Sequence, residues 1–243
     1  MGLEDYNIDM DNIPKHVAVI MDGNGRWAKK RHMPRTAGHK VGVERVRDVI
    51  KGADKLNIRH LTLYAFSTEN WKRPKEEVGV LMNLLASYLK KEINELDREG
   101  VRIRVLGELD RIPEKVRKEI ESAVERTSEN DNINLNIALN YGSRLEIVRA
   151  VKMISEKVKD GELEIDDINE ESFKDYLYTA GQPDPDLMIR TSGEERLSNF
   201  LLYQLAYGEF IFTETPWPEF TEDRFFEMIE LYQQRNRRFG AIK

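Results

Sequence analysis

Acidic and cationic side chains follow the first apolar segment of this chain at the point where that segment ends. Asp22 comes directly after residues 17–21 and precedes a turn with two glycines, which leads into Arg26. Such a turn between a strand and a helix presents backbone N–H groups to an anion, most often a phosphate. An aspartate at the edge of a phosphate site would repel the ligand unless a divalent cation lies between them. The segment therefore predicts a phosphorylated ligand that binds together with Mg²⁺.

Polar side chains also follow later apolar segments, at residues 67–74, 140–144 and 190–199. Arginines recur there, and their forked guanidinium groups bind two phosphate oxygens at once. One predicted anion site consists of Arg190 and Arg196, on either side of a Thr-Ser-Gly turn. A second predicted site consists of Arg26, Arg35, His39 and Arg73. Two cationic clusters predict two anionic substrates, and hence a transferase rather than a simple binding protein.

Each of these features has a structural alternative. Asp22 is also a residue type that caps helices, and surface arginines commonly form ion pairs of little energetic value. The glycine turn matches the dinucleotide fingerprint through Ala28, but that fingerprint requires an acid about 20 residues further on, at the end of the next strand. The next predicted strand ends much later, at Ser67, and no Walker motif is present. A nucleotide-dependent oxidoreductase and a non-catalytic partner subunit remain the alternatives.

The elements that must position these residues alternate along the chain. Short apolar segments predict strands at residues 17–21, 60–66, 101–106, 133–139, 187–189 and 210–213. Helical patterns occupy residues 38–56, 75–99, 113–125, 144–158, 171–178, 199–207 and 222–239. Alternation of this kind predicts an α/β fold: a single domain with an open, mostly parallel six-stranded sheet flanked by helices on both faces. Residues 1–13 are expected to form an N-terminal tail, and residues 159–171 a surface loop.

Composition excludes several classes of protein. The chain has 243 residues, of which 40% are hydrophobic and 34% charged, as in soluble globular proteins. It has no cysteine, which excludes disulfides and thiolate metal sites and agrees with a cytosolic location. The N-terminal residues do not resemble a signal peptide, and no apolar run approaches the ~20 residues that span a bilayer. The net charge of −6 argues against nucleic-acid binding.

Two of the predicted helices carry more apolar residues than a single packing face needs. One set lies within residues 78–96, and the other follows Gly38, with Val41, Val43, Val46 and Val49. Such helices are buried on two sides, form a dimer interface, or line a slot for a long apolar ligand. The sequence alone does not distinguish these arrangements.

Several motifs taken together resemble one family. Residues 16–31, 64–74, 136–142 and 186–210, in this order, resemble the cis-prenyltransferases, and most closely the bacterial undecaprenyl diphosphate synthase (isoprenyl transferase) type. The resemblance runs from about Pro14 to Gly240, so residues 14–243 are expected to be one catalytic domain. It implies an enzyme that condenses isopentenyl diphosphate, repeatedly and with cis stereochemistry, onto an allylic diphosphate such as farnesyl diphosphate. The implied product is a long-chain polyprenyl diphosphate, undecaprenyl diphosphate, a precursor of the lipid carrier for cell-wall synthesis.

The resemblance also implies roles for individual residues. Asp22 matches the essential aspartate that acts with Mg²⁺ as the allylic diphosphate leaves, and Asn70 matches the proton acceptor. An amide is a weak base, so diphosphate or water is the alternative acceptor. Contacts to the allylic substrate are implied for Gly23, Asn24, Gly25, Arg26, Trp27, Arg35, His39, Ser67, Thr68, Glu69, Trp71 and Arg73. Contacts to isopentenyl diphosphate are implied for Arg190, Arg196, Leu197 and Ser198.

Metal, partners and location follow from the same resemblance. Asp22 and Glu209 are the implied Mg²⁺ ligands, with Glu209 at the partner-facing edge of the sheet. The chain departs from many relatives at Glu195, where they carry histidine. The growing hydrocarbon chain implies an apolar tunnel between the sheet and the helices. A cytoplasmic homodimer is implied, with peripheral contact to the membrane for product release.

Overall fold

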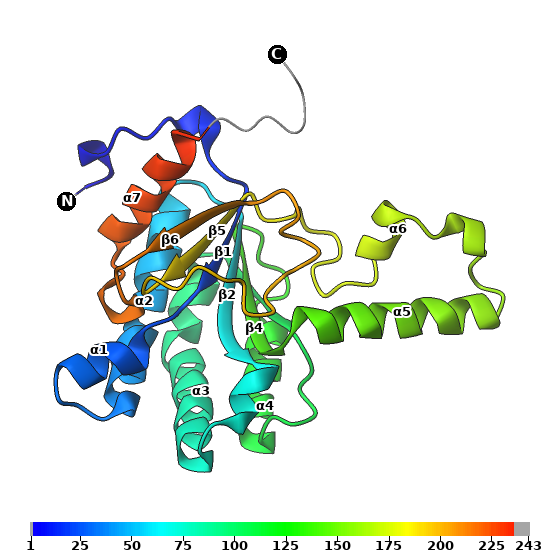
Figure 1. Cartoon of the computed structure of the whole chain (residues 1–243), viewed down its shortest axis with the longest axis horizontal. Helices are drawn as coiled ribbons and strands as arrows, with labels where there is room; N and C mark the ends of the chain where they lie inside the picture. Colours follow the sequence, from blue (N-terminus) through cyan, green and yellow to red (C-terminus); the bar gives the residue numbers. More distant parts are fainter. Residues whose placement is uncertain (1, 236–243) are drawn as a thin grey trace.

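A single open sheet of parallel strands forms the centre of the molecule (Figure 1). The computed structural model describes residues 2–235. Its strands are β1 (His16–Ile20), β2 (His60–Ser67), β3 (Val101–Leu106), β4 (Ile133–Tyr141), β5 (Leu187–Thr191) and β6 (Glu209–Thr213). Their order is β3-β4-β2-β1-β5-β6, and every neighbouring pair is parallel. The prediction of a six-stranded sheet in one α/β domain is confirmed, and the described strands are all parallel.

The strand order reverses beside β1. The chain leaves β1 for β2 on one side, and after β4 it crosses to β5 on the other side. In open parallel sheets, the loops after two such strands diverge and leave a crevice at their carboxyl ends. Asp22 follows β1 and Arg190 lies near the end of β5, so both residues lie at this crevice.

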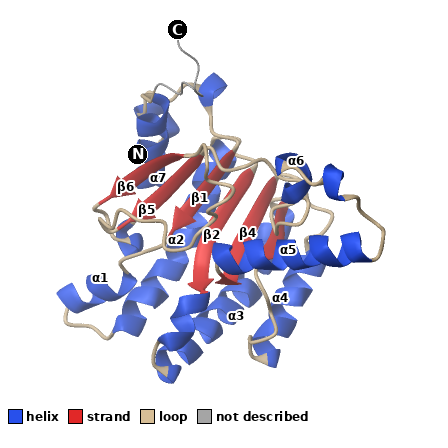
Figure 2. Ribbon diagram, turned by 45° about the vertical axis from the view of Figure 1, so that its right-hand side comes forward, coloured by secondary structure: helices blue, strands red, loops and turns tan. Residues whose placement is uncertain are grey.

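Helices gather on one face of the sheet. The described helices are α1 (Asn24–Lys30), α2 (Arg35–Lys55), α3 (Lys75–Arg98), α4 (Glu114–Arg126), α5 (Ser143–Lys159), α6 (Glu170–Lys174) and α7 (Glu222–Gln233). The larger apolar core lies between the sheet and α2, α3, α4 and α7 (Figure 2). A smaller core on the other face includes Ala18, Met188, Phe200 and Leu205. Helix α5 extends away from the sheet, and the chain then turns back so that α6 lies alongside the middle of α5 (Figure 1).

Proline and glycine set the limits of several helices. Pro34, Pro74 and Pro113 precede the first residues of α2, α3 and α4, as the fixed φ of proline favours. Gly100 follows α3 with φ of +71°, a left-handed conformation that ends a helix with little strain in glycine. The predicted starts at residues 75 and 113 are therefore accurate to within one residue.

The predicted helix at residues 199–207 is wrong. Asn199 and Leu201 have positive φ values of 65° and 44°, which no α-helix contains. The backbone there bonds to distant segments, since the carbonyl of Asn199 accepts from the N–H of Ser143 at 2.8 Å. This face of the sheet is consequently covered by a loop where a helix was expected.

The chain ends differ in part from expectation. The N-terminal segment packs on α7: the ring of Tyr6 lies edge-on to Phe226 at 5.4 Å, and the N–H of Asp9 donates to Gln233 Oε1 at 2.9 Å. Residues 236–239 of the last predicted helix lie outside the described residues. The predicted loop at residues 159–171 contains only a short 3₁₀ turn, Ile165–Asp167, before α6 begins. Within residues 2–235, no helix is both long and apolar enough to cross a membrane.

Candidate active site at the carboxyl edge of the sheet

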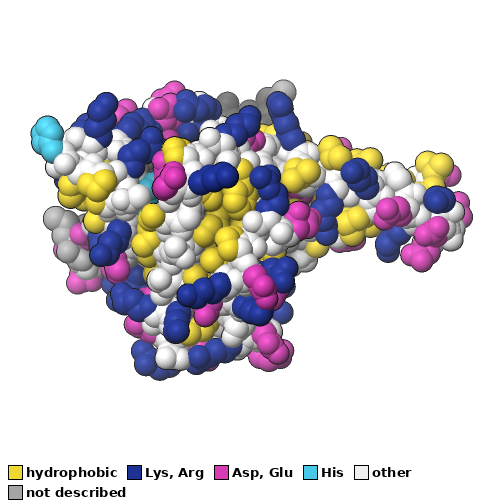
Figure 3. Space-filling model, turned by 90° about the horizontal axis from the view of Figure 1, so that it is seen from below, with side chains coloured by type: hydrophobic (Ala, Val, Ile, Leu, Met, Phe, Trp, Pro, Cys, Tyr) yellow, Lys and Arg dark blue, Asp and Glu magenta, His cyan; other side chains and the backbone are white. Residues whose placement is uncertain are grey.

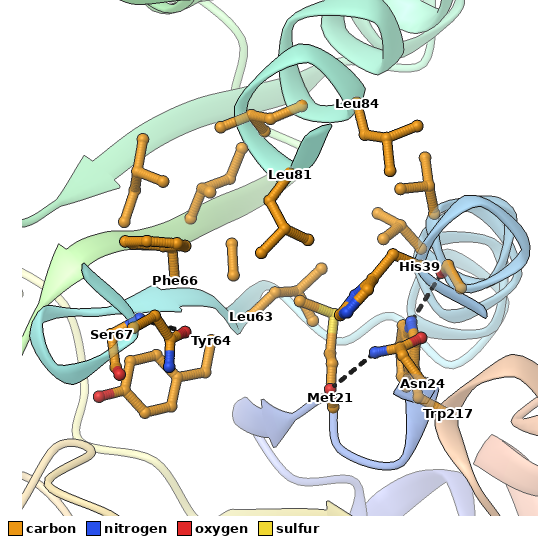
Figure 4. A pocket seen from close by; sticks show the side chains of 18 of the residues that line it. Met21, Asn24, His39, Leu63, Tyr64, Phe66, Ser67, Leu81, Leu84 and Trp217 are labelled. Atoms are coloured by element: carbon orange, nitrogen blue, oxygen red, sulfur yellow. Dashed lines mark hydrogen bonds between the residues drawn. The ribbon is translucent and has the colours of Figure 1, made fainter. Parts of the chain in front are cut away.

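A pocket of about 320 Å³ opens at the carboxyl edge, between the sheet and helices α2 and α3. In Figure 4, Leu81 and Leu84 of α3 lie across the pocket from Leu63 and Phe66 of β2. Viewed from this edge, yellow apolar side chains lie at the centre, with Lys and Arg around them (Figure 3). Apolar residues of both helices, such as Val46 of α2 and Leu85 of α3, therefore line a pocket. The polar residues that line it include Asp22, Asn24, His39, Asn70, Arg73, Arg190 and Ser198.

Asp22 is held as a carboxylate at the mouth of this pocket. Its Oδ2 lies 3.0 Å from Arg190 Nη2 and 3.1 Å from Arg26 Nη2. Its Oδ1 accepts the N–H of Gly23 at 2.6 Å. Burial alone would raise the pKa of Asp22, but Arg190, the Gly23 N–H and Arg26 outweigh it and hold the pKa below its usual value. Asp22 is therefore ionised at neutral pH.

The glycine turn after Asp22 requires glycine. Gly23 has φ of +97°, and a Cβ on it would lie 2.5 Å from Ser192 Oγ. The turn leads directly into α1, whose first N–H groups have no acceptor within the helix. The predicted strand is confirmed, but only Gly23 lies in the turn, because α1, which was not among the predicted helices, begins at Asn24 and includes Gly25. The turn leaves backbone donors close to Asp22.

Three buried polar atoms of the site lack a hydrogen-bond partner within the described structure: Asn24 Oδ1, His39 Nε2 and Arg190 Nε. Buried polar groups in native proteins are almost always paired, so an unpaired cluster marks a place for a ligand. Burial, with the cations Arg73 and Arg35, lowers the pKa of His39 to about 4. The imidazole is therefore neutral at neutral pH. Figure 4 shows His39 directed from α2 into the pocket.

Three of the four residues of one predicted anion site are brought together around Glu77 of α3. Glu77 Oε1 lies 3.0 Å from Arg73 Nη1, 3.6 Å from Arg35 Nη2 and 3.8 Å from His39 Nε2. The fourth residue, Arg26, instead contacts Asp22 and Glu194. Sequence reasoning missed Glu77, which lies in the first turn of α3, four residues after Arg73.

The other predicted anion site, Arg190 and Arg196, is connected to Arg26 through Asp22. Arg190 is only 4% exposed, and its Nη1 donates to Ser198 Oγ at 2.8 Å and to the carbonyl of Arg196. Its Nη2 donates to Asp22 Oδ2, so one guanidinium contacts both Asp22 and Ser198. The side chain of Arg196 is exposed and pairs with Glu194. Leu197 packs against the smaller core.

The segment after β2 forms a 3₁₀ turn, Thr68–Lys72, that brings Asn70 to the pocket. Asn70 Oδ1 accepts the N–H of Ser67 at 3.2 Å. A second pocket of about 540 Å³ adjoins this turn and shares three residues with the first, Ser67, Asn70 and Ser198. Its other lining residues are Glu69, Arg144, Leu197, Asn199 and Leu202. Sequence reasoning did not assign Arg144 or Asn199 to a site.

Neither of the tryptophans expected at the substrate lines these pockets. Trp27 donates its indole N–H to Glu219 Oε1 at 2.8 Å, and Trp71 donates to Asn140 Oδ1 at 2.7 Å. Trp217, which sequence reasoning did not select, lines the first pocket and donates to the carbonyl of Gly42 at 2.6 Å.

Glu209 lies at the other end of the sheet from Asp22. It begins β6, whereas Asp22 bonds to Thr191, which pairs with the last residue of β6. Along β6, four residues separate Glu209 from the strand end that lies beside Asp22, a distance of about 13 Å at roughly 3.3 Å per residue. Arg235 Nη1 lies 3.6 Å from Glu209 Oε2. Within one chain, therefore, Glu209 does not bind the same ion as Asp22, and no cluster of three or more His, Cys, Asp or Glu side chains placed for a metal occurs in residues 2–235.

Comparisons with known proteins identify the family. The prenyltransferase family model described as undecaprenyl diphosphate synthase matches residues 20–240. Isoprenyl transferase of Clostridium perfringens is 56% identical over 233 residues, which are 96% of this chain and 92% of that protein. The ditrans,polycis-undecaprenyl-diphosphate synthase ((2E,6E)-farnesyl-diphosphate specific) of Micrococcus luteus is 48% identical over 241 residues, 99% of this chain and 97% of that protein.

A solved structure gives the same answer for the fold. Lavandulyl diphosphate synthase from Lavandula x intermedia, in complex with dimethylallyl diphosphate, aligns with a TM-score of 0.92 at 37% sequence identity. The alignment covers 94% of this chain and 99% of that one. Together with the matched family model, these similarities show that the chain belongs to the undecaprenyl diphosphate synthase family of cis-prenyltransferases.

Proposed function

We propose that this protein condenses isopentenyl diphosphate, repeatedly and with cis stereochemistry, onto an allylic diphosphate to give undecaprenyl diphosphate. Farnesyl diphosphate is the proposed primer, since the name of the Micrococcus luteus relative states that specificity. The observation that carries the proposal is Arg190, which joins Asp22 to Ser198 at the mouth of an apolar pocket. One cation between two anion sites, above an apolar cavity, suits two diphosphates of which one carries a hydrocarbon tail.

The allylic diphosphate is proposed to bind on the Asp22 side of Arg190. Arg35, His39 and Arg73 would supply its cations and donors, and the first turn of α1 its backbone N–H groups. When the carbon–oxygen bond breaks, negative charge grows on the leaving diphosphate. Fixed cations stabilise that charge more strongly in the transition state than in the ground state. The hydrocarbon tail would lie in the pocket between β2 and α3, and its growth requires the pocket to continue as a tunnel.

Mg²⁺ is the proposed cofactor, and the donor set fits it in one specific way. Mg²⁺ is commonly held by one or two carboxylates together with substrate phosphate oxygens and water. Asp22 supplies one ionised carboxylate, so the remaining ligands would come from the diphosphate and water. When bound, the ion would act as a Lewis acid that neutralises the leaving diphosphate. Glu209 would take part only from a second copy of the chain, because it lies far from Asp22 in its own chain.

Isopentenyl diphosphate is proposed to bind on the Ser198 side of Arg190, with contacts from Arg196 and Leu197. Asn70 lines both pockets, and we propose that it faces the carbon that loses a proton. Its amide oxygen already accepts the Ser67 N–H, and an amide is a weak base. The diphosphate or a water molecule therefore remains the alternative proton acceptor.

The proposed assembly is a homodimer. Leu145, Val148 and Val151 form one exposed apolar stripe on α5, each about half exposed. Phe210 and Phe212 lie on the sheet face that loops cover incompletely. A second copy packed on this stripe and face would bury apolar surface that monomers rarely expose. The protein is proposed to work in the cytoplasm, with peripheral contact to a membrane that receives its hydrocarbon product.

Incubation with labelled isopentenyl diphosphate and a series of allylic primers, followed by sizing of the products, tests the proposal. Long products that require a primer and disappear with EDTA are expected. A folded protein that makes no product would favour the non-catalytic subunit. Tight binding of NAD(P) without turnover would favour the oxidoreductase. Either result would overturn the proposed function.

A further inference from the structure

The side chain of Asn199 joins two segments that line the second pocket. Its Nδ2 donates to Glu69 Oε1 at 3.0 Å, and its Oδ1 accepts the backbone N–H of Arg144 at 2.9 Å. Glu69 belongs to the 3₁₀ turn with Asn70, and Arg144 lies in the first turn of α5. Because one end of an amide donates and the other accepts, the two bonds fix its orientation.

The surroundings of Asn199 are arranged to hold this amide in place. Its backbone has φ of 65°, a left-handed conformation that asparagine tolerates better than most residues. The N–H of Ser143 donates to the carbonyl of Asn199 at 2.8 Å, and the N–H of Leu202 donates to Ser143 Oγ at 2.9 Å. These reciprocal bonds attach the loop that carries Asn199 to the start of α5.

Gly142 provides the space for this contact. A Cβ on Gly142 would lie 2.7 Å from Asn199 Nδ2 and 2.7 Å from Thr68 Oγ1. Its φ of −161° is extended and available to any residue, so glycine is needed there for space alone. The start of α5, the loop at Asn199 and the turn at Thr68 therefore meet at one point.

We propose that Asn199 is a positioning residue for isopentenyl diphosphate, which holds Glu69 and Asn70 at a fixed distance from Ser198. The inference rests on the proposed function and adds to it a residue that joins the two substrate segments. Ser198 precedes Asn199 and bonds to Arg190, so displacement of this loop also disturbs the shared guanidinium. Hydrogen bonds that include the one from Asn199 outweigh burial and lower the pKa of Glu69, which keeps this acceptor ionised.

The contact can be tested by exchanging the donor and the acceptor of the hydrogen bond between Asn199 and Glu69. Asn199→Asp keeps an acceptor for the Arg144 N–H but places a carboxylate against Glu69. The KM for isopentenyl diphosphate is expected to rise about tenfold, the ratio set by loss of one hydrogen bond to a charged group. The KM for the allylic primer should change by less than about threefold, because Arg35 and His39 lie on α2 and Arg73 is held by Glu77 of α3. Adding Glu69→Gln restores a hydrogen bond in which residue 69 donates and residue 199 accepts. The KM of the double variant for isopentenyl diphosphate should therefore return most of the way to the wild-type value.

Asn130 supplies a matched control. Its Nδ2 donates to Asp97 Oδ1 at 3.1 Å, the same amide–carboxylate contact at a place that lines neither pocket. Asn130→Asp should lower the thermal midpoint and leave both KM values unchanged. An equal rise in KM for isopentenyl diphosphate in Asn130→Asp would attribute the effect to general destabilisation and overturn the proposal.

Two further outcomes are decisive. If the double variant has the same KM for isopentenyl diphosphate as Asn199→Asp alone, the Glu69 contact does not position the substrate. Active wild-type enzyme with an unaffected Asn199→Asp variant would refute only this inference. Wild-type protein without turnover would refute the proposed function, and the inference with it.

Discussion

Asp22→Asn is the substitution that separates charge from shape at the candidate active site. Asparagine has the same outline and keeps an oxygen that accepts the N–H of Gly23. It removes the negative charge that lies 3.0 Å from Arg190 and 3.1 Å from Arg26. Because Arg190 also holds Ser198, the geometry on the other side of the guanidinium should persist. The variant therefore tests the charge of Asp22 with little change in packing.

The expected loss of turnover is large and the expected loss of stability is modest. Removal of one group that stabilises transition-state charge costs on the order of 10²–10³ in kcat. Breaking a fully buried ion pair costs about 3–5 kcal/mol. The Asp22 side chain is 31% exposed and the variant keeps one hydrogen bond, so the free energy of unfolding is expected to fall by about 1–2 kcal/mol. For a chain of this size, that corresponds to a fall in Tm of roughly 2–8 °C.

Acid sensitivity provides a second signature of the same charge. The folded-state pKa of Asp22 is lowered, so its ion pair stabilises the fold above the usual carboxyl pKa of 3.8. That contribution is lost as the pH falls through the lowered pKa. Unfolding in denaturant at pH 7 and below pH 4 should therefore show a smaller pH-dependent loss for Asp22→Asn than for the wild type.

The assay measures turnover of labelled isopentenyl diphosphate with farnesyl diphosphate as primer, with calorimetry on the same samples. Asp48→Asn is the matched control, because Asp48 lies 2.7 Å from Arg45, is 28% exposed and lines neither pocket. It should leave kcat within about twofold of the wild type, as surface ion pairs contribute little. Turnover of Asp22→Asn within tenfold of wild type would refute the reasoning, since the charge would then have no place in the chemistry.

Three other predictions concern the loop contact, the assembly and the core. Gly142→Ala places a Cβ 2.7 Å from Asn199 Nδ2 and should lower stability by about 1–3 kcal/mol and raise the KM for isopentenyl diphosphate; unchanged calorimetry would contradict the contact. Val148→Glu, on the exposed stripe of α5, should weaken the proposed dimer, so that sedimentation velocity gives a smaller average mass than for the wild type at the same concentration. Burial lowers the pKa of His16 from 6.5 to about 4, so the unfolded chain takes up the proton first and stability falls as the pH drops through this range. Denaturant titrations between pH 7 and pH 4 should show a loss that is smaller in His16→Gln than in the wild type by up to about 3 kcal/mol, because His39 still contributes in both proteins.

The strands and several helix starts were predictable because local residues determine them. Residues 17–21 form a short apolar run that ends at a charged turn, and Pro74 and Pro113 favour helix starts whatever surrounds them. The strand order was not predictable, because it depends on the crossing from β4 to β5. The prediction of a helix at residues 199–207 was wrong because contacts between distant parts of the chain determine this segment too. Its apolar pattern is helical, but the carbonyl of Asn199 bonds to Ser143, more than fifty residues earlier in the chain.

The positions of some site residues were predictable from the sequence, and those of others were not. Asp22 follows β1, Arg190 lies near the end of β5 and Ser198 lies in the loop after β5, so the topology brings them together at one edge of the sheet. Trp27 and Trp71 illustrate the limit, because an indole ring that could contact a substrate also carries an N–H that must find an acceptor. In this fold those acceptors, on Glu219 and Asn140, lie away from the pockets. No pattern in the sequence states which acceptor is near.

The place of Arg190 is consistent with the proposal that two cation clusters, separate in the sequence, would act on one reaction centre. A condensation of two diphosphates must bring two anions close together, and their repulsion grows as they approach. A guanidinium that donates from one nitrogen to the Asp22 side and from another to the Ser198 side lies between them and offsets that repulsion. Lysine has a single ammonium group and cannot span both sides in this way. Arg190→Lys should therefore lose more activity than the exposed Arg196→Lys, and equal losses in the two variants would show that cation number, rather than the bridging geometry, governs the site.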